Sequence, residues 1–457
     1  MVIATRALAL TVALCSSIAG ATPDPRDVAT AVATEQLKAG PIAGMSIAIV
    51  QDGKTLFAGG FGKAELDNDV AATEQTVYRI NSITKAFTAT LILQLAEAGK
   101  LRLEDHVSKY FPEYTHDHDP TLVQLLTHTS GMASYQGPLF HKSIKLDLTA
   151  KQWVDALAAD KLFLAAPDTA WSYSNAAYDL LGMIATKLTG EDLAHLFATR
   201  IAAPAGLTQT ALCDTRAVVP HRARSYVWVK DHFEHAESWG TYGEASGGLC
   251  SSVLDLVKFV QALDAGKLVS ARSLARMRAP RVLPGGQSFD YGLGTRRGHV
   301  GKTRVIAYTG SGEEWSSAAV EVADRKLLVV VLANTAPGGE GSSPALAMDI
   351  VRRLLGITDH LADLAVPAAL GAKLAGKWQS PDGSVHELAI DNHHLVAKDS
   401  GHELRFYYQG RGSFRTGDDT PLRGLEIVFD LAHKQPALSV YRSGVFSEGD
   451  LPRRIGD

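Results

Sequence analysis

The sequence predicts an α/β protein of the α+β kind, with one antiparallel sheet flanked by helices, an α-helical subdomain and then a small all-β barrel. Strand patterns lie at both ends of the region before residue 362, with helical patterns between them. Beyond residue 363, short strand patterns recur about every 8 to 12 residues. A chain of 457 residues is also too long for one average domain. We therefore expect a leader over 1–21 and domains over 22–362 and 363–457.

The first 21 residues have the pattern of a secretory signal peptide. Arg6 supplies the positive charge, and residues 7–15 form an apolar core that is too short to span a bilayer. Residues 19–21 (Ala-Gly-Ala) give the small-x-small pattern that precedes cleavage. We expect cleavage after Ala21 and a periplasmic or secreted location, with a retained N-terminal helix as the alternative.

The composition excludes some classes of partner. The chain has 45 basic and 49 acidic residues, a net charge of −4 and no long basic run, so nucleic acid is not an expected partner. Outside the leader no segment has about 18 or more apolar residues, so we expect no membrane span in the mature chain. The sequence leaves the oligomeric state open.

Cys213 and Cys250 are the cysteines that remain outside the leader. An exported protein permits a disulfide between them, but two cysteines do not make a disulfide framework. We therefore expect two separate buried thiols, with a bridge as the alternative.

The first half of the 22–362 domain begins with a hairpin and continues with helices. Asp52-Gly53 is a hairpin turn sequence between two apolar, β-branched runs. A mostly helical, turn-rich stretch follows to about residue 263. The expected elements are strands over 45–50 and 55–62, and helices over 82–99, 176–188 and 254–263.

The second half of this domain returns to strands, and the 363–457 domain consists of strands. Asp324-Arg325 is a tight turn, and residues 337–343 form a Gly-rich loop. The first domain should end with strands over 305–308, 316–322 and 327–334 and a helix over 345–355. A linker at 365–367 should lead to barrel strands over 376–379, 385–390, 394–398, 404–408, 426–430 and 438–442, with His393-His394 beside a turn.

Ser82 and Lys85 stand three positions apart at the start of the first expected helix, so they share one helix face. A neutral amine there can take the hydroxyl proton and make the serine a nucleophile. The serine also lies at the positive end of the helix, where developing negative charge is favoured. This short pattern recurs by chance, and a helix cap is the alternative role for Ser82.

Three further segments complete a set with these two residues: Tyr173-Ser174-Asn175 at a helix start, 245–249 (ASGGL) before a helix, and 308–311 (YTGS) at a strand end. In this order and spacing they resemble the serine β-lactamase and penicillin-binding-protein superfamily. The Y-x-N form and the segment 125–131 (LLTHTSG) are most similar to its class C β-lactamase, DD-peptidase and esterase branch. The resemblance implies a β-lactamase-like fold for the first domain. The C-terminal barrel resembles the lipocalin-like modules of some relatives.

The resemblance implies catalytic roles for Ser82, Lys85 and Tyr173. Ser82 would attack a carbonyl to give an acyl-enzyme, and Lys85 would deprotonate it. Tyr173 would pass the proton to the leaving group and later activate water. An adjacent ammonium lowers the pKa of a phenol, so Lys85 and Tyr173 should titrate as one coupled unit. Core filling is the alternative role for Tyr173.

The remaining motif residues are expected to bind the substrate. Asn175 would orient Lys85 and the substrate amide, with a helix cap as its alternative role. Backbone N–H groups of Ser82 and Ser311 would form the oxyanion hole. Gly310 would let substrate lie along the strand edge, within the strand motif that begins with Tyr308 and Thr309.

One position departs from the family pattern. Superfamily members that bind a substrate carboxylate usually have Lys, and many relatives have His, where this chain has Tyr308. Glu313 and Glu314 follow, and they would repel a carboxylate or attract an amine; a solvated loop is the alternative for this pair. We therefore expect peptide, amide or ester substrates rather than efficient β-lactam hydrolysis.

No metal or other cofactor is expected. Residues 116–119 (HDHD) have the right chemistry, but no complementary Cys or His spacing completes a site. We expect an exported serine hydrolase that acts on a small-molecule or peptide substrate, either a D-amino-acid peptidase, carboxypeptidase-like, or an esterase. The alternatives are a β-lactamase and a non-catalytic penicillin- or peptidoglycan-binding sensor.

Overall fold

The structure of the chain is a computed structural model. It describes residues 23–134, 149–214, 216–236, 244–312, 314–337, 341–358, 361–379, 385–399, 402–417, 425–431, 437–442, 445–448 and 453–455. The expected leader over 1–21, Glu313 and the centre of the expected Gly-rich loop lie outside these residues.

One antiparallel sheet is assembled from both ends of the first domain, as the sequence predicts. The central pairing joins β1 to β14 with Met45 opposite Ala333, so segments almost 300 residues apart in the chain are neighbours in the sheet. Asp52 and Gly53 both have positive φ, which suits the tight hairpin between β1 and β2. The strand order is β3 (Val70–Ala71), β2 (Lys54–Glu65), β1 (Gly44–Gln51), β14 (Leu327–Ala333), β13 (Ser316–Val322), β12 (Thr303–Ser311) and β11 (Arg296–Val300).

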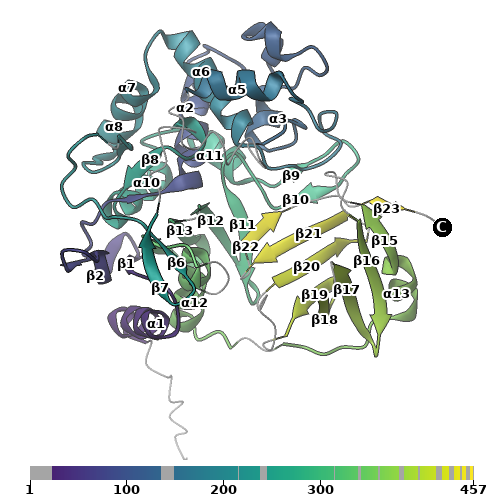
Figure 1. Cartoon of the computed structure of the whole chain (residues 1–457). Helices are drawn as coiled ribbons and strands as arrows, with labels where there is room; N and C mark the ends of the chain where they lie inside the picture. Colours follow the sequence, from purple (N-terminus) through teal and green to yellow (C-terminus); the bar gives the residue numbers. More distant parts are fainter. Residues whose placement is uncertain are drawn as a thin grey trace, which may run out of the picture.

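Each face of this sheet is covered by its own layer of helices (Figure 1). Alternate strand residues face opposite sides, so Val329 and Val331 belong to one apolar core while Val330 and Leu332 belong to the other. On the first face pack α1 (Pro25–Ala39) and α12 (Ser343–Leu354). The second face carries α2 (Thr84–Glu97), α10 (Val253–Asp264) and the α-helical subdomain, with α3 (Leu122–Leu126), α5 (Ala150–Ala158), α6 (Asn175–Thr189) and α7 (Leu193–Phe197).

Local signals set the ends of the helices that carry the site. The Ser174 hydroxyl accepts a hydrogen bond from the Ala177 amide and caps α6, and Gly190 ends that helix with φ 73°. The smaller elements are η1 (Asn81–Ile83), η2 (Val107–Lys109), η3 (Pro112–Tyr114), η4 (Ala198–Ala202), α8 (Ala203–Ala205), α9 (Glu244–Gly247), α11 (Ala271–Arg278), η5 (Ala323–Arg325) and the short strands β4 (Tyr78–Arg79), β5 (Ala211–Leu212), β6 (Tyr226–Val229), β7 (His232–His235), β8 (Leu249–Ser251), β9 (Arg281–Val282) and β10 (Ser288–Phe289).

The C-terminal strands form an antiparallel meander that curls into a half-barrel (Figure 1). Its edge strand β22 pairs with β11, where Val445 lies opposite Gly298, so the half-barrel continues the main sheet. The sequence did not predict α13, β19, β22 or β23, which are short. The elements are α13 (Ala368–Leu374), β15 (Gly376–Gln379), β16 (Val385–Asp391), β17 (His394–Asp399), β18 (His402–Gly410), β19 (Ser413–Thr416), β20 (Leu425–Asp430), β21 (Ala437–Arg442), β22 (Val445–Glu448) and β23 (Arg453–Ile455).

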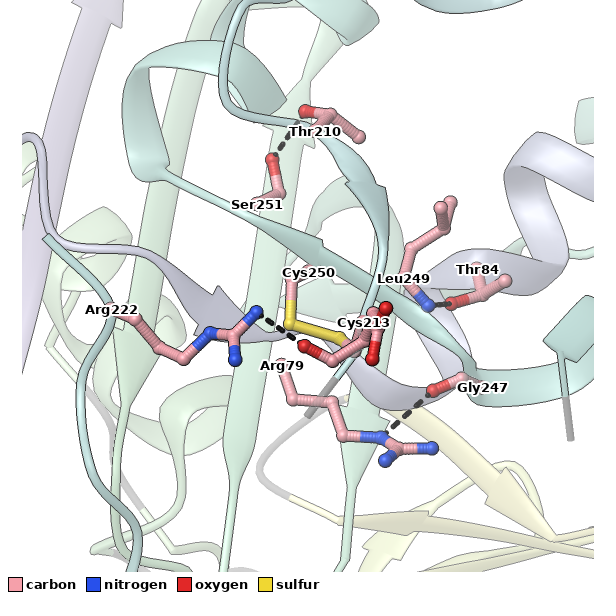
Figure 2. The surroundings of a disulfide bond; sticks show 10 residues. Arg79, Thr84, Thr210, Cys213, Arg222, Gly247, Leu249, Cys250 and Ser251 are labelled. Carbon is pink, nitrogen blue, oxygen red and sulfur yellow. Dashed lines mark hydrogen bonds between the residues drawn. A yellow bond between two sulfur atoms is a disulfide. The ribbon is translucent and has the colours of Figure 1, made fainter. Parts of the chain in front are cut away.

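Cys213 and Cys250 form a disulfide, so the expectation of two separate thiols is wrong (Figure 2). Pairing of β5 with β8 places Ala211 opposite Cys250 and brings the two cysteine Cα atoms to 5.2 Å, within the range that a disulfide can bridge. This closeness arises from pairing between segments 37 residues apart, which the sequence pattern did not reveal.

Within the described part of the chain, no helix combines the length and the apolar character that crossing a membrane requires.

Candidate active site

Ser82 lies in the short 3-10 turn η1, directly before α2. The preceding residue, Asn81, has φ 46°, a left-handed conformation that is uncommon for a residue with a side chain. Its amide Nδ2 donates a hydrogen bond to the Trp315 carbonyl, 3.2 Å away, which anchors the turn to the end of the main sheet. The backbone therefore bends sharply at the serine, at the positive end of the buried helix α2.

Lys85 is in the first turn of α2 and is buried. Its ammonium donates to three acceptors: Ser82 Oγ at 3.1 Å, Asn175 Oδ1 at 2.7 Å and the Ser246 carbonyl at 2.7 Å. All three ammonium hydrogens therefore have a partner. The structure places Asn175 against Lys85, the contact that the sequence predicts.

Tyr173 comes from the segment just before α6, and its phenol donates a hydrogen bond to Ser82 Oγ at 2.7 Å. Nζ of Lys85 lies 4.7 Å from the centre of the same ring. Lys85 and Tyr173 thus meet at the Ser82 hydroxyl, and Asn175 joins them through Lys85, although the segments lie about 90 residues apart.

The electrostatic environment shifts the pKa values of both proton-transfer candidates. Burial lowers the pKa of Lys85, and the positive charge of Arg296 lowers it further, although Tyr173 and Asp179 act in the opposite direction. Burial alone would raise the pKa of Tyr173, but the positive charges of Lys85 and Arg296, and its hydrogen bonding with Lys85 and Ser82, lower it overall. Both groups are therefore closer to their deprotonated forms than they would be in water.

Arg296 is a cation of the site that the sequence analysis missed. It begins β11, and its guanidinium carbon lies 5.5 Å from the centre of the Tyr173 ring and 5.6 Å from that of Tyr291. Arg304 is nearer to the strand motif in sequence, but its side chain is exposed on β12. Only the strand pairing reveals which arginine approaches the phenol.

His128 supports Tyr173 from behind. It is buried, with φ 59°, and its ring lies 4.3 Å from that of Tyr173. Nδ1 accepts from the Ser174 amide, and Nε2 is 3.1 Å from the Tyr291 hydroxyl. Burial, aided by the positive charges of Lys85 and Arg296, lowers the pKa of His128 far below its ordinary value, so the ring is neutral. It holds its own turn and orients the start of α6.

Asp179 fixes the carbonyl that Lys85 uses. Its carboxylate accepts hydrogen bonds from the backbone amides of Ala245 and Ser246 at 3.2 and 3.0 Å, and from the Ser246 hydroxyl at 3.3 Å. The sequence segment 245–249 therefore reaches the site through the Ser246 carbonyl. The one sequence signal for a role of Asp179 is that it is an acidic residue within the otherwise apolar start of the 176–188 helix.

The end of β12 lies directly against the serine turn. A Cβ added at Gly310 would lie 2.2 Å from the Ile80 carbonyl oxygen and 2.9 Å from the Ser82 amide nitrogen, so only glycine allows this approach. Ser311 is the last residue of β12, opposite Ser316, and Thr309 is half-buried on the same strand. This brings the residues of the expected oxyanion hole to neighbouring segments.

Tyr308 does not direct its phenol to Ser82. It is buried and accepts a hydrogen bond from Arg278 at 3.3 Å, and Arg278 is itself paired with Glu321 at 2.6 Å. Burial raises the pKa of Tyr308 to about 12, so the phenol is neutral. Glu314 is 3% exposed, so the interpretation of a solvated loop is wrong for it, and Glu313 lies outside the described residues.

The C-terminal half-barrel also reaches the site. Tyr441 on β21 packs in an aromatic cluster with Trp171, Phe289 and Tyr291, against which Tyr173 is half-buried. The Tyr441 hydroxyl donates to Asp290 at 2.7 Å. The half-barrel is therefore part of the scaffold behind Tyr173, a contact that the sequence did not predict.

A cleft of about 370 Å³ lies beside the disulfide. Arg79, three residues before Ser82, donates from Nε to the Gly247 carbonyl (Figure 2). Arg222 donates to the backbone carbonyl of Asp214, the residue after Cys213. These two arginines line the cleft with Glu314, Trp315 and the disulfide itself, so its wall combines apolar groups with charges of both signs.

Sequence comparison identifies a family for most of the chain. A sequence model of the family described as Beta-lactamase matches residues 29–351. Penicillin-binding protein 4* of Bacillus subtilis (strain 168) is 26% identical over 382 residues, which cover 78% of this chain and 84% of that protein.

Two solved structures share the fold. The octameric penicillin-binding protein homologue from Pyrococcus abyssi covers 93% of this chain and 99% of its own, with a TM-score of 0.63 and 23% identity. The D-amino acid amidase from Ochrobactrum anthropi SV3 covers 72% of this chain and 98% of its own, with the same TM-score and identity. The chain therefore belongs to the Beta-lactamase family and is a serine hydrolase of this superfamily.

Proposed function

We propose that this chain is an exported hydrolase that cleaves amide, peptide or ester bonds through an acyl-enzyme on Ser82. The observation that carries the proposal is the 2.7 Å contact of the Tyr173 hydroxyl with Ser82 Oγ, next to Lys85 at 3.1 Å. A serine that only capped a helix would not need two titratable groups with lowered pKa values at its oxygen.

Acylation begins when Ser82 Oγ attacks the substrate carbonyl carbon. The serine proton passes to the Tyr173–Lys85 pair, and the carbonyl oxygen takes the negative charge. The Lys85 ammonium donates its three hydrogens to three acceptors. We therefore assign the role of accepting the serine proton to Tyr173 in its phenolate form, which Lys85 stabilises. When the intermediate collapses, the same proton leaves with the amine or alcohol. Water then attacks the acyl-enzyme carbonyl, gives its proton to the same pair, and releases the acid as Ser82 takes the proton back.

Backbone amides of Ser82 and Ser311 are proposed to bind the oxyanion. The close approach of Gly310 to the Ser82 amide supports this assignment, because it brings the β12 edge to the serine turn. One such donor contributes about 3 kcal/mol to transition-state stabilisation. Asn175, which already holds Lys85, is proposed to orient the substrate amide as well.

The preferred substrates are proposed to be D-amino-acid amides or peptides, or esters, rather than β-lactams. The Tyr308 position offers no cation, since its phenol is neutral and bonded to Arg278. A likeness to the fold of a D-amino acid amidase is consistent with amide cleavage.

A second candidate is a β-lactamase or a penicillin-binding sensor, and Arg296 is the observation that favours it. Its positive charge lies within 5.5 Å of the Tyr173 ring, so a substrate carboxylate near that ring would be attracted. A sensor would be acylated by a β-lactam and remain acylated, whereas a β-lactamase would hydrolyse its acyl-enzyme and release the opened β-lactam.

A fluorophosphonate probe and a substrate panel test both candidates. Wild-type protein should be labelled at Ser82, and Ser82→Ala should not be labelled. Values of kcat/KM for p-nitrophenyl esters, D-amino-acid amides and nitrocefin should rank nitrocefin lowest. Full labelling of Ser82→Ala would remove the nucleophile assignment, and nitrocefin as the best substrate by orders of magnitude would replace the first candidate by the second.

A further inference from the structure

Asp363, His393 and His394 come together where the linker meets the hairpin between β16 and β17. Each offers one oxygen or nitrogen atom, and these three atoms all lie within 4.8 Å of one another. Nε2 of His394 is 3.0 Å from Asp363 Oδ1, and Nε2 of His393 is 3.6 Å from the same oxygen. Two imidazoles thus converge on one carboxylate oxygen, far in sequence from the residues around Ser82.

The hairpin backbone makes this convergence possible. Successive residues of a regular strand point to opposite faces, so adjacent histidines would normally diverge. Here Asn392 and His393 have φ values of 43° and 61°, in the left-handed region. The turn brings the two rings to a centroid distance of 4.3 Å. The histidine pair therefore lies on one side of the hairpin, toward the linker.

The spacing of the three atoms fits a transition metal. Zn²⁺ binds imidazole nitrogen and carboxylate oxygen at about 2.0–2.2 Å, and tetrahedral angles then separate ligand atoms by roughly 3.4 Å. The two histidine–carboxylate separations, 3.0 and 3.6 Å, lie on either side of this value, and all three ligand atoms lie within 4.8 Å of one another. Imidazole ligands suit zinc, copper and nickel better than magnesium or calcium, which take oxygen ligands.

The surroundings give the cluster a fixed side and an open side. His394 is buried, packs edge-on against Tyr407 at 4.7 Å, and directs Nε2 to Asp363. The side chains of Asp363 and His393 are each about half exposed, which leaves an entry path and room for a water ligand. Backbone hydrogen bonds from Leu364 to Tyr408 and from Val366 to His393 hold the linker beside the hairpin.

We propose that Asp363, His393 and His394 bind one divalent transition-metal ion, with Zn²⁺ as the representative. The ion would join the linker to the β16–β17 hairpin and so fasten the half-barrel to the chain that leads from α12. A metal that binds only the folded state stabilises it. This role is independent of the proposed hydrolase chemistry, and its test needs no substrate.

The test is a titration of the full chain, stripped with a chelator, with Zn²⁺ by calorimetry and with Co²⁺ by absorption. We expect one ion per chain, visible d–d bands from a low-symmetry cobalt site, and a higher Tm with zinc. Asp363→Asn keeps the shape and the contact with His394 but removes the charge, and His393→Ala removes an exposed ligand. Each should weaken binding by at least about tenfold and reduce the zinc-dependent shift in Tm.

His195→Ala is the matched control, because His195 forms an exposed pair with Glu191 at 3.7 Å that resembles the His393–Asp363 pair. Its zinc affinity should equal that of the wild type. Absence of saturable binding in the wild type, or equal binding by the wild type, Asp363→Asn and His393→Ala, would overturn the proposal. His394 is left unchanged because its burial makes a folding defect a competing explanation.

Discussion

The Tyr173 hydroxyl lies 2.7 Å from Ser82 Oγ, closer than the Lys85 amine at 3.1 Å. The lysine also donates to Asn175 and to the Ser246 carbonyl, so its place is fixed by three contacts. The tyrosine therefore has the more direct path to the serine proton. The lysine supplies the positive charge that lowers the pKa of the phenol.

Tyr173→Phe should keep the fold and remove the group that exchanges a proton with Ser82. A positioned acid–base group contributes roughly 10²–10⁴-fold, so kcat/KM for an activated ester should fall by that factor. Tyr114→Phe is the matched control, because Tyr114 is a buried tyrosine bonded to Asp155 in the helical subdomain. Steady-state kinetics of both variants with a p-nitrophenyl ester measure the difference. Near-normal kcat/KM in Tyr173→Phe would leave Lys85 as the base.

Arg296→Gln should move the acidic limb of the kcat/KM profile to higher pH. The arginine lowers the pKa values of both Lys85 and Tyr173, so removing its charge raises both. A larger share of the pair is then protonated at a given pH, and the reactive form appears only at higher pH. Arg304→Gln, which removes an exposed charge on β12, should leave the profile in place. An unchanged limb in Arg296→Gln would show that Arg296 does not tune the pair.

Removal of the Cys213–Cys250 bridge should destabilise the protein more than it slows catalysis. Closing a loop with a sequence separation of 37 limits the unfolded chain, a contribution of roughly 3–4 kcal/mol to the free energy of unfolding. The Ser246 carbonyl is held separately by Asp179, so Lys85 keeps its partner. Urea unfolding and kcat of the Cys213→Ser/Cys250→Ser variant test the two statements. A folded variant with kcat reduced tenfold or more would mean that the bridge positions the site.

The sequence predicted the sheet and the residues around Ser82 because these depend on local patterns. The β-branched, apolar run at 327–334 favours a buried strand, and Ser82 and Lys85 share a face through helix geometry alone. It is harder to predict from sequence which strand residues direct their side chains to the site. The direction of Tyr308 and the approach of Arg296 depend on which face each strand turns to the helices, and one residue of register reverses that face.

Contacts between distant segments explain the other differences. The disulfide follows from the β5–β8 pairing, and the packing of Tyr441 follows from the position of the half-barrel. Neither leaves a periodic signal in the sequence. The catalytic roles of Ser82, Lys85 and Tyr173 stay predictions, and the experiments above test them.

The attachment of the half-barrel to β11 should depend on pH through His299 and Glu426. Nε2 of His299 lies 3.1 Å from the Glu426 carboxylate. This hydrogen bond raises the pKa of His299 above its ordinary 6.5, helped by the charge of Asp290 and opposed by burial and by Arg415. Burial would raise the pKa of Glu426, but the bond from His299 lowers it below its ordinary 4.5.

The stabilisation from His299 is complete below pH 6.5 and is lost as the pH rises through the higher pKa of the folded state. The stabilisation from Glu426 is present above pH 4.5 and is lost as the pH falls through its lower folded value. The pair should therefore stabilise the protein most in weak acid. Urea unfolding from pH 5 to 9 should give a loss of stability as the pH rises above 6.5, and this loss should be larger in the wild type than in His299→Gln. His195→Gln, which removes an exposed histidine, should behave as the wild type. Equal pH dependence in the wild type and His299→Gln would mean that this pair does not hold the half-barrel to β11.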